Sequence, residues 1–322
     1  MKHGGNVWQG GGPEAWLDFS ASLRPEGPPE WVRRTAREAL AAIRYYPDRS
    51  LRSARQGTAA YANVPEGWVL PAAGGEAAID LALSLRKSPV YVEKVTFGLY
   101  AERAAVHHRP LSEAMAGATV TLCNPNNPTG AARTREAVLS LHESVAATQG
   151  ELLVDEAFID YCPENSVRDC ACDTLTIVGS LTKILSIPGL RLGYVIASPE
   201  NIRKMETLAP TWPLNALAAA IAAELPLHKA EIARDAEANR QRRAAFAASL
   251  QAMGAQVYPS QANFLFCDFA RDMTEAAERL KQRGILVRTC ASFGLGGQYL
   301  RLAVKTEEEN ETLIRELKQC LS

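Results

Sequence analysis

The chain has 322 residues; 47% are hydrophobic and 22% charged, and 35 Lys and Arg nearly balance 36 Asp and Glu. This composition excludes a disordered protein and a general electrostatic attraction to nucleic acid or an anionic membrane. No apolar run approaches the roughly 20 residues of a membrane span, and the first residues lack the apolar core of a signal peptide, so we expect a cytoplasmic protein. The length suits one large or two interleaved domains.

Residues 1–30 are rich in Gly and Pro and predict an extended arm. Pro28 and Pro29 then open a helical apolar pattern that reaches Ile43, because proline suits the first helical turn. Further elements follow in order: a helix over 51–62, a strand over 68–71, a glycine turn at 74–75 and a helix over 77–85. This strand, glycine turn and helix can present backbone N–H groups to a phosphate, although the glycines also fit a plain tight turn.

The middle of the chain alternates short apolar strands with helical segments. The predicted strands cover 90–92, 119–123, 152–155, 175–178 and 192–196, and one of the helix candidates between them covers 135–147. Apolar strands joined by helical crossovers predict a buried, mostly parallel sheet with helices on both faces. Ligands of such sheets bind at the carboxyl ends of the strands, and polar motifs follow three strands here: 124–130, 155–158 and 180–183.

The last third of the chain has a different pattern. Long helices are predicted over 215–225 and 229–253, followed by strands over 262–266, 285–288 and 299–304 and helices over 274–283 and 307–321. We therefore expect a second, smaller α/β domain. The predicted domains are 1–44 (arm and part of the small domain), 45–210 (large domain) and 211–322 (small domain).

Seven cysteines are spread from Cys123 to Cys320, and an odd number predicts reduced thiols rather than a disulfide framework. Cys170 and Cys172 have the spacing of a metal or redox pair. Because no second pair stands at ligand spacing, we predict no metal site.

Lys183 and Arg191 are the first candidates for chemistry. The apolar neighbours of Lys183 predict a partly desolvated amine with a lowered pKa, which can attack a carbonyl carbon. Arg191 follows within reach of a phosphate beside that amine. Taken alone, the two residues also fit a surface lysine and a helix-capping arginine. The choice between these interpretations therefore depends on the other motifs of the chain.

The strand ends supply what a phosphorylated pyridine aldehyde requires: an amine, a carboxylate that keeps the ring nitrogen protonated, and a nest for the phosphate. Lys183 and Asp155 provide the first two, and Gly74, Gly75, Ser180 and Arg191 the nest. Asn127 is placed to donate to the ring oxygen, and Phe97 to cover the ring face. Singly, Asp155 fits a helix cap and Asn127 a turn residue, but their joint order on successive strands favours the cofactor site.

The motifs at 124–130, 155–158, 180–183 and 189–194 resemble those of the fold-type I pyridoxal-phosphate enzymes, the aspartate aminotransferase superfamily. Segments at 3–6, 17–21, 46–48, 155–160, 259–264 and 286–288 are similar to those of the threonine-phosphate decarboxylases of cobalamin biosynthesis. Histidinol-phosphate aminotransferases share much of this pattern. The resemblance implies an α/β transferase fold, in which a large domain holds a mostly parallel seven-stranded sheet between helices and the N-terminal arm joins a smaller C-terminal α/β domain.

The resemblance also implies a role for each matched residue. Lys183 would carry pyridoxal 5'-phosphate and move protons at the substrate α-carbon, and Asp155 would pair with the ring nitrogen. The cofactor phosphate would meet Gly74, Gly75, Glu76, Ser180, Arg191 and, from the second subunit of a homodimer with shared active sites, Tyr46. Arg301 would bind the substrate carboxylate. The substrate phosphate would meet His3, Asn6, Arg24, Gly27 and Arg288.

A few positions depart from the family pattern. Ala73, Ser22 and Arg24 stand where related sequences usually carry Asn, and Arg24 adds a cation near the expected substrate phosphate. Phe158 stands where aminotransferases commonly place a tyrosine that bonds the ring oxygen, which favours a decarboxylase.

The expected reaction is decarboxylation of O-phospho-L-threonine to (R)-1-aminopropan-2-yl phosphate and carbon dioxide. The sequence leaves three alternatives open: a histidinol-phosphate-type aminotransferase, a phosphoserine decarboxylase and a non-catalytic protein that binds pyridoxal phosphate. The expected ligand is a small phosphorylated amino acid, and neither nucleic acid nor a membrane is an expected partner.

Overall fold

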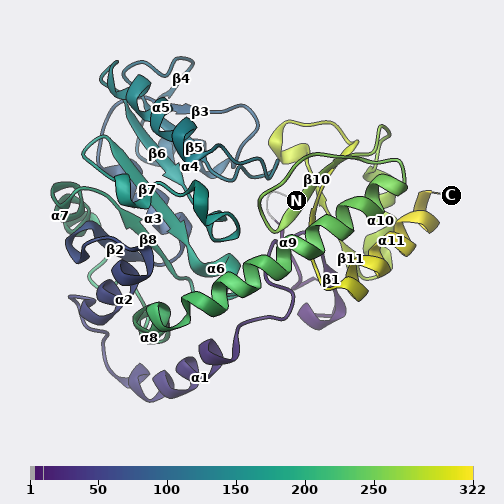
Figure 1. The fold of residues 1–322 in the computed structure, drawn as a ribbon, viewed down its shortest axis with the longest axis horizontal. Coiled ribbons are helices and arrows are strands. Elements are labelled where there is room, and N and C mark those ends of the chain that lie inside the picture. Colours follow the sequence, from purple (N-terminus) through teal and green to yellow (C-terminus); the bar gives the residue numbers. More distant parts are fainter. Residues whose placement is uncertain (1–3, 10, 322) are drawn as a thin grey trace.

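The computed structural model describes residues 4–9 and 11–321, and its larger sheet has seven strands (Figure 1). The strand order is β2-β8-β7-β6-β5-β3-β4. These strands are β2 (Val69–Ala72), β3 (Val90–Val92), β4 (Leu111–Ser112), β5 (Thr119–Cys123), β6 (Glu151–Asp155), β7 (Leu175–Ser180) and β8 (Gly193–Ile196). Only β8 runs antiparallel, against both β2 and β7, so the prediction of a mostly parallel seven-stranded sheet is confirmed.

Apolar side chains cover both faces of this sheet, which explains why its strands are continuous apolar runs. Successive residues point to opposite faces: Val154 packs with one core cluster and Leu153 with the other. The first cluster includes side chains of α2 (Arg52–Ala62), α5 (Arg135–Ala146) and α8 (Ala216–Glu224). The second includes side chains of α3 (Gly75–Ser84), α4 (Leu99–Val106) and α7 (Pro199–Leu208).

The smaller sheet is antiparallel, with the order β12-β13-β10-β9. Its strands and helices are β9 (Gln256–Val257), β10 (Phe264–Asp268), β12 (Arg288–Thr289), β13 (Tyr299–Ala303), α10 (Thr274–Gln282) and α11 (Glu307–Leu321). The long helix α9 (Lys229–Ala252) extends from the end of α8 to the smaller unit in Figure 1. It contributes Phe246 and Leu250 to the smaller core. The second α/β unit is thus present, although the domain boundaries given above stay predictions.

The N-terminal arm joins the smaller unit through β1 (Leu17–Asp18), which pairs in parallel with β11 (Ile285–Leu286). This pairing divides the strand predicted over 285–288, because β11 pairs with β1 whereas β12 pairs with β13. After the arm, α1 (Glu30–Ala39) packs against α8 and continues as a 3-10 turn over Leu40–Arg44. In the described part of the chain, no helix is long and apolar enough to cross a membrane.

Candidate active site

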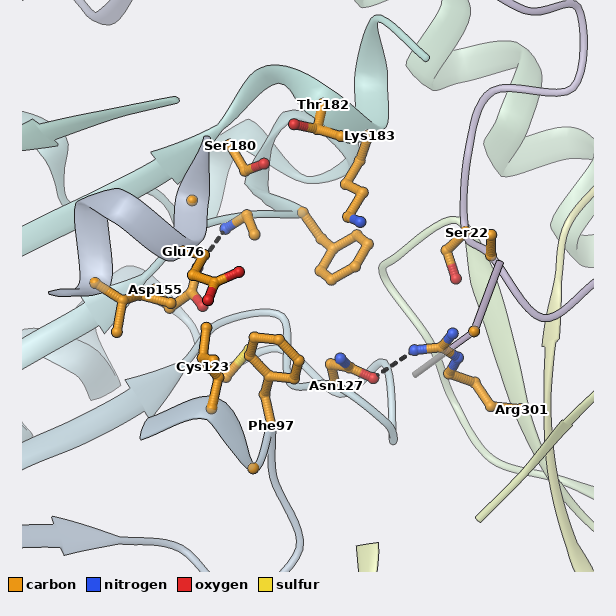
Figure 2. Close-up of a pocket in the computed structure, with 18 of the residues that line it drawn as sticks. Ser22, Glu76, Phe97, Cys123, Asn127, Asp155, Ser180, Thr182, Lys183 and Arg301 are labelled. Carbon is orange, nitrogen blue, oxygen red and sulfur yellow. Dashed lines mark hydrogen bonds between the residues drawn. The ribbon is translucent and has the colours of Figure 1, made fainter. Parts of the chain in front are cut away.

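A cavity of about 350 Å³ lies where the carboxyl ends of β5, β6 and β7 face the smaller sheet. Figure 2 shows side chains of both sheets and of the N-terminal arm around it. The predicted site residues in its wall are Gly75, Glu76, Phe97, Asn127, Asp155, Ser180, Lys183, Arg191, Arg288 and Arg301. Residues predicted from separate motifs therefore meet at one place, because parallel strands end at the same edge of a sheet.

Lys183 lies on the single-turn helix α6 (Leu181–Ile184), directly after β7. Its amine points toward the centre of the cavity in Figure 2. Burial is the largest cause that lowers the pKa of Lys183 to about 8; the cations Arg301 and Arg191 also lower it, and Asp155 opposes them. The lowered pKa makes the neutral, nucleophilic amine far more abundant near neutral pH than in an ordinary lysine.

Asp155 is the last residue of β6 and is 4% exposed. The Tyr100 hydroxyl donates a hydrogen bond to Oδ2 at 2.7 Å, and the Ala157 N–H donates to Oδ1 at 3.0 Å. Burial raises the pKa of Asp155, and the hydrogen bond from Tyr100 is the largest of the effects that oppose it. A buried carboxylate held at both oxygens is suited to bind a cation, such as a protonated ring nitrogen.

The start of α3 offers an anion site. Gly74 has φ 88° and ψ 172°, a conformation that favours glycine, and no described side chain caps the helix, so its first N–H groups can meet an anion. A Cβ at Gly74 would lie 2.7 Å from the Arg191 guanidinium, and a Cβ at Gly75 would lie 3.1 Å from the Ser180 Cβ. The turn therefore packs closely against the cation and the hydroxyl that would complete a phosphate nest.

Thr182 adds a further polar group that the sequence reasoning missed. Its hydroxyl is buried, has no hydrogen-bond partner among the described residues and lies beside Ser180 in Figure 2. An unpartnered buried hydroxyl costs free energy unless a ligand satisfies it. Its place in the Ser180–Lys183 motif was the available clue.

Arg301 on β13 bonds Asn127, which follows β5. Its Nη1 donates to the Asn127 Oδ1 at 2.7 Å, and its Nη2 donates to the Ser20 carbonyl at 2.6 Å. Because Arg301 occupies the Asn127 oxygen, Asn127 can offer its amide nitrogen to a ligand in the cavity (Figure 2). Burial, together with the nearby charge of Arg288, lowers the pKa of Arg301 to about 10.

Arg288 on β12 pairs in register with Arg301, and both side chains line the cavity. Arg288 donates to the Ser292 Oγ at 2.6 Å and lies over the Phe293 ring, 5.4 Å from its centroid. Like charges directly opposite each other destabilise an antiparallel pair. This wall therefore suits a ligand that brings more than one anionic group.

Other predicted residues do not line this cavity. Arg24 is held by Asp235, with 2.9 Å between Nε and Oδ2, and donates to the Gly27 carbonyl at 2.8 Å. Arg24 is therefore not in the cavity wall, and its guanidinium is paired with Asp235 instead. Asn6 and Gly27 also lie outside the cavity wall, and His3 lies outside the described residues.

Tyr46 and Gly74 are likewise absent from the wall of the cavity among the described residues. Gly74 directly precedes Gly75 and contacts Arg191, as described above. Tyr46 is 79% exposed and stacks on Trp212, with ring centroids 4.3 Å apart. Its side chain is thus on the surface of its own chain.

Sequence reasoning also missed Tyr100 and the cavity-facing role of Ser22. The Ser22 hydroxyl is buried, lines the cavity and has no hydrogen-bond partner in the described part of the chain. Tyr100 occupies what the sequence shows as an ordinary apolar position of a helix, and no neighbouring residue distinguishes it from a core tyrosine. Its significance depends on a carboxylate that is remote in sequence.

These groups fit pyridoxal 5'-phosphate on structural grounds. The glycine turn with Ser180, Thr182 and Arg191 can hold the phosphate, Asp155 the ring nitrogen, and Lys183 the aldehyde carbon. The unpartnered Thr182 hydroxyl and the uncapped start of α3 are polar groups that such a ligand would satisfy.

Comparison with known proteins gives the family. The family Aminotransferase class I and II matches residues 108–317, so the chain belongs to this family. Threonine-phosphate decarboxylase of Salmonella typhimurium is 31% identical over 99% of this chain and 96% of that protein. Histidinol-phosphate aminotransferase of Symbiobacterium thermophilum is also 31% identical, over 95% of this chain and 90% of that protein.

Solved structures show the same fold. L-threonine-O-3-phosphate decarboxylase from Porphyromonas gingivalis superposes with a TM-score of 0.83 at 23% identity, over 94% of this chain and 98% of that chain. Histidinol-phosphate aminotransferase from Sinorhizobium meliloti, in complex with pyridoxal-5'-phosphate, has a TM-score of 0.80 at 19% identity, over 94% and 89% of the chains. The protein is a pyridoxal 5'-phosphate-dependent enzyme of the aminotransferase fold; its relatives include both decarboxylases and aminotransferases.

Proposed function

We propose that this enzyme decarboxylates O-phospho-L-threonine to (R)-1-aminopropan-2-yl phosphate and carbon dioxide, a reaction of cobalamin biosynthesis. The observation that carries the proposal is the pair of buried cations, Arg288 and Arg301, beside Lys183. O-phospho-L-threonine carries a carboxylate and a phosphate on a short chain, so each of its anions can meet one of the two guanidinium groups. The 2-oxoglutarate of an aminotransferase also carries two anionic groups, so the preference for decarboxylation depends on Phe158, described below. The similarity to a threonine-phosphate decarboxylase over 99% of this chain is compatible with this reaction, and an aminotransferase relative has the same 31% identity.

In this proposal Arg301 binds the substrate carboxylate and Arg288 the phosphate. Arg301 is oriented by its hydrogen bonds to Asn127 and the Ser20 carbonyl, and its Nε has no partner among the described residues. A planar guanidinium suits bidentate pairing with a carboxylate. The Ser22 hydroxyl can donate to one of the two substrate anions.

Lys183 and Asp155 perform the proton chemistry in this proposal. When bound, the cofactor supplies an electron-accepting ring that stabilises the carbanion left after carbon dioxide departs. Asp155 holds the proton on the ring nitrogen. Lys183 then delivers a proton from Nζ to the α-carbon, a task that suits an amine whose pKa is about 8.

Phe158 supports a decarboxylase over an aminotransferase. It is buried in the cavity wall and packs edge-on against Phe264, with centroids 5.1 Å apart and an interplanar angle of 82°. A phenylalanine offers no hydroxyl to the ring oxygen, which leaves Asn127 as the donor.

The decisive assay supplies purified enzyme, pyridoxal 5'-phosphate and O-phospho-L-threonine without any keto acid. Release of carbon dioxide and of the aminopropyl phosphate supports the proposal, and no gas release refutes it. A parallel reaction with histidinol phosphate and 2-oxoglutarate tests the aminotransferase, which would form glutamate. Borohydride reduction that fixes the cofactor on Lys183, without turnover in either assay, would indicate a non-catalytic binding protein.

Phosphoserine is the closest competing substrate because it lacks only a methyl group. A missing methyl group in a pocket is worth about 1–3 kcal/mol, which corresponds to roughly 10–200-fold in kcat/KM. Measured kcat/KM values for the two phosphoamino acids decide between them: a higher value for phosphoserine would make it the preferred substrate.

We further propose a homodimer in which Tyr46 of one subunit reaches the phosphate nest of the other. An exposed apolar segment supports this proposal: Leu40, Ile43, Tyr45 and Tyr46 are all exposed at the end of the first helix. The test pairs a Tyr46→Ala chain with a Lys183→Ala chain. The mixed dimer should be more active than the mean of the two parents, because one of its sites carries neither substitution; a monomer by light scattering refutes the proposal.

A further inference from the structure

Tyr100 lies on α4 with its hydroxyl directed at Asp155. The side chain is fully buried and donates to the Asp155 Oδ2 at 2.7 Å. The other carboxylate oxygen accepts the Ala157 N–H at 3.0 Å. Asp155 is therefore held by one backbone donor and one side-chain donor, and the side-chain donor can be removed by substitution.

The direction of this hydrogen bond follows from the environment of both groups. Burial and the neighbouring charge of Asp155 raise the pKa of the Tyr100 hydroxyl well above its usual value. The phenol therefore keeps its proton near neutral pH and acts as the donor. Its hydrogen bond favours the ionised form of Asp155, as do the Ala157 N–H and the charge of Lys183, against burial, which favours the neutral form. The Cys123 thiol also faces Tyr100 and Asp155, and burial raises its pKa, so it stays neutral.

Packing alone does not explain a tyrosine at this position. The Tyr100 ring meets Phe97 edge-on, with centroids 5.8 Å apart and an interplanar angle of 89°, a contact that phenylalanine would also make. A buried hydroxyl costs free energy unless it is bonded, and here the Asp155 carboxylate satisfies it. The hydroxyl thus has a specific partner in the active site.

We propose that Tyr100 is a positioning residue that keeps Asp155 ionised and oriented toward the ring-nitrogen proton of the cofactor. By donating to Oδ2, Tyr100 reduces the tendency of Asp155 to take that proton for itself. Both decarboxylation and transamination require a protonated ring, so the inference holds for either reaction. It rests on the cofactor of the family and not on the proposed substrate.

Tyr100→Phe tests this role because it removes the hydroxyl and keeps the ring. In holoenzyme prepared with pyridoxal 5'-phosphate labelled with 15N in the ring, we expect the nitrogen resonance of the variant to move toward that of unprotonated pyridine. Cofactor affinity of the apoprotein should fall about tenfold or more, in line with a lost hydrogen bond to a charged group. On acidification, Tyr100→Phe should lose the cofactor at a higher pH than the unmodified enzyme does, because Asp155 would take up a proton more readily.

Tyr61→Phe is the matched control. The Tyr61 hydroxyl donates to the Asp160 Oδ1 at 2.9 Å, and neither residue lines the cavity. This variant loses a comparable Tyr–Asp hydrogen bond and should leave the ring-nitrogen resonance and the cofactor affinity unchanged. An unshifted resonance in Tyr100→Phe, or an equal shift in the control, overturns the proposal.

A second substitution covers the case in which Tyr100→Phe does not fold. Replacement of Tyr100 by 3-fluorotyrosine keeps the hydroxyl and makes it a stronger donor. The loss of cofactor binding on acidification should then move to lower pH, opposite to the effect of phenylalanine. No movement, or movement to higher pH, contradicts the role of the hydrogen bond.

Discussion

Arg288 and Arg301 lie directly opposite each other on the antiparallel strands β12 and β13, with only 4% and 7% of their surfaces exposed. Two buried like charges in this register are unfavourable without compensation. The hydrogen-bond partners described for Arg301 are the neutral oxygens of Asn127 and Ser20. A substrate with two anionic groups can offset the repulsion between these two guanidinium groups, because both line the cavity.

Arg288→Gln should raise the KM for O-phospho-L-threonine and reduce the preference for it over unphosphorylated L-threonine. In the proposed complex Arg288 forms a buried charge pair with the substrate phosphate. Removing one partner of such a pair costs about 2–5 kcal/mol, so we expect kcat/KM to fall at least about thirtyfold. Arg283→Gln, which removes a surface ion pair with Glu316, is the control and should change little. Equal losses with both substrates would show that Arg288 does not bind the phosphate.

The rate at which pyridoxal 5'-phosphate attaches to the apoprotein should rise with pH, with a midpoint at about 8 and a plateau at higher pH. Below the pKa of Lys183, about 8, the amine is protonated and cannot attack the aldehyde. Arg301→Gln removes a cation that lowers this pKa, so the midpoint should move to higher pH. Stopped-flow absorbance measures the profile, with Arg279→Gln on an exposed helix face as the control; an unmoved midpoint in Arg301→Gln contradicts the prediction.

Gly74→Ala should weaken cofactor binding and destabilise the protein. The positive φ of 88° and the approach of a Cβ to the Arg191 guanidinium, at 2.7 Å, both oppose a side chain. Such backbone strain costs about 1–3 kcal/mol. Denaturant unfolding and absorbance titration measure the two effects. Gly67→Ala is the control, since a Cβ there meets nothing within 4 Å; equal behaviour of the two variants would exclude the strain.

Thr182→Val should lower cofactor affinity about tenfold without destabilising the apoprotein. The Thr182 hydroxyl has no hydrogen-bond partner among the described residues, so its removal loses no bond in the apoprotein but loses one to the cofactor phosphate. Thr121→Val is the opposite case, because the Thr121 hydroxyl donates to the Tyr91 carbonyl at 3.0 Å. That control should lose stability and keep its cofactor affinity. Unchanged affinity in Thr182→Val would rule out the proposed contact.

Prediction from sequence succeeded where structure depends on local pattern. The strand 119–123 and the helix 307–321 were predicted with the boundaries that the structure has. Short elements such as β1, β4 and β9, each of two residues, were missed because so few residues show no periodicity. They are held in place by neighbouring strands rather than by their own sequence.

The same distinction applies to the site. By itself the sequence determined the order of the motifs, and therefore the strand ends at which Asp155 and Ser180 lie; their chemical roles stay predictions. Only the tertiary structure decided which side chains meet. Tyr100 bonds Asp155 across 55 residues of chain, Arg301 bonds Asn127 across 174, and Arg24 pairs with Asp235 across 211. Such pairs depend on how distant elements pack, and the pattern of nearby residues carries no information about that packing.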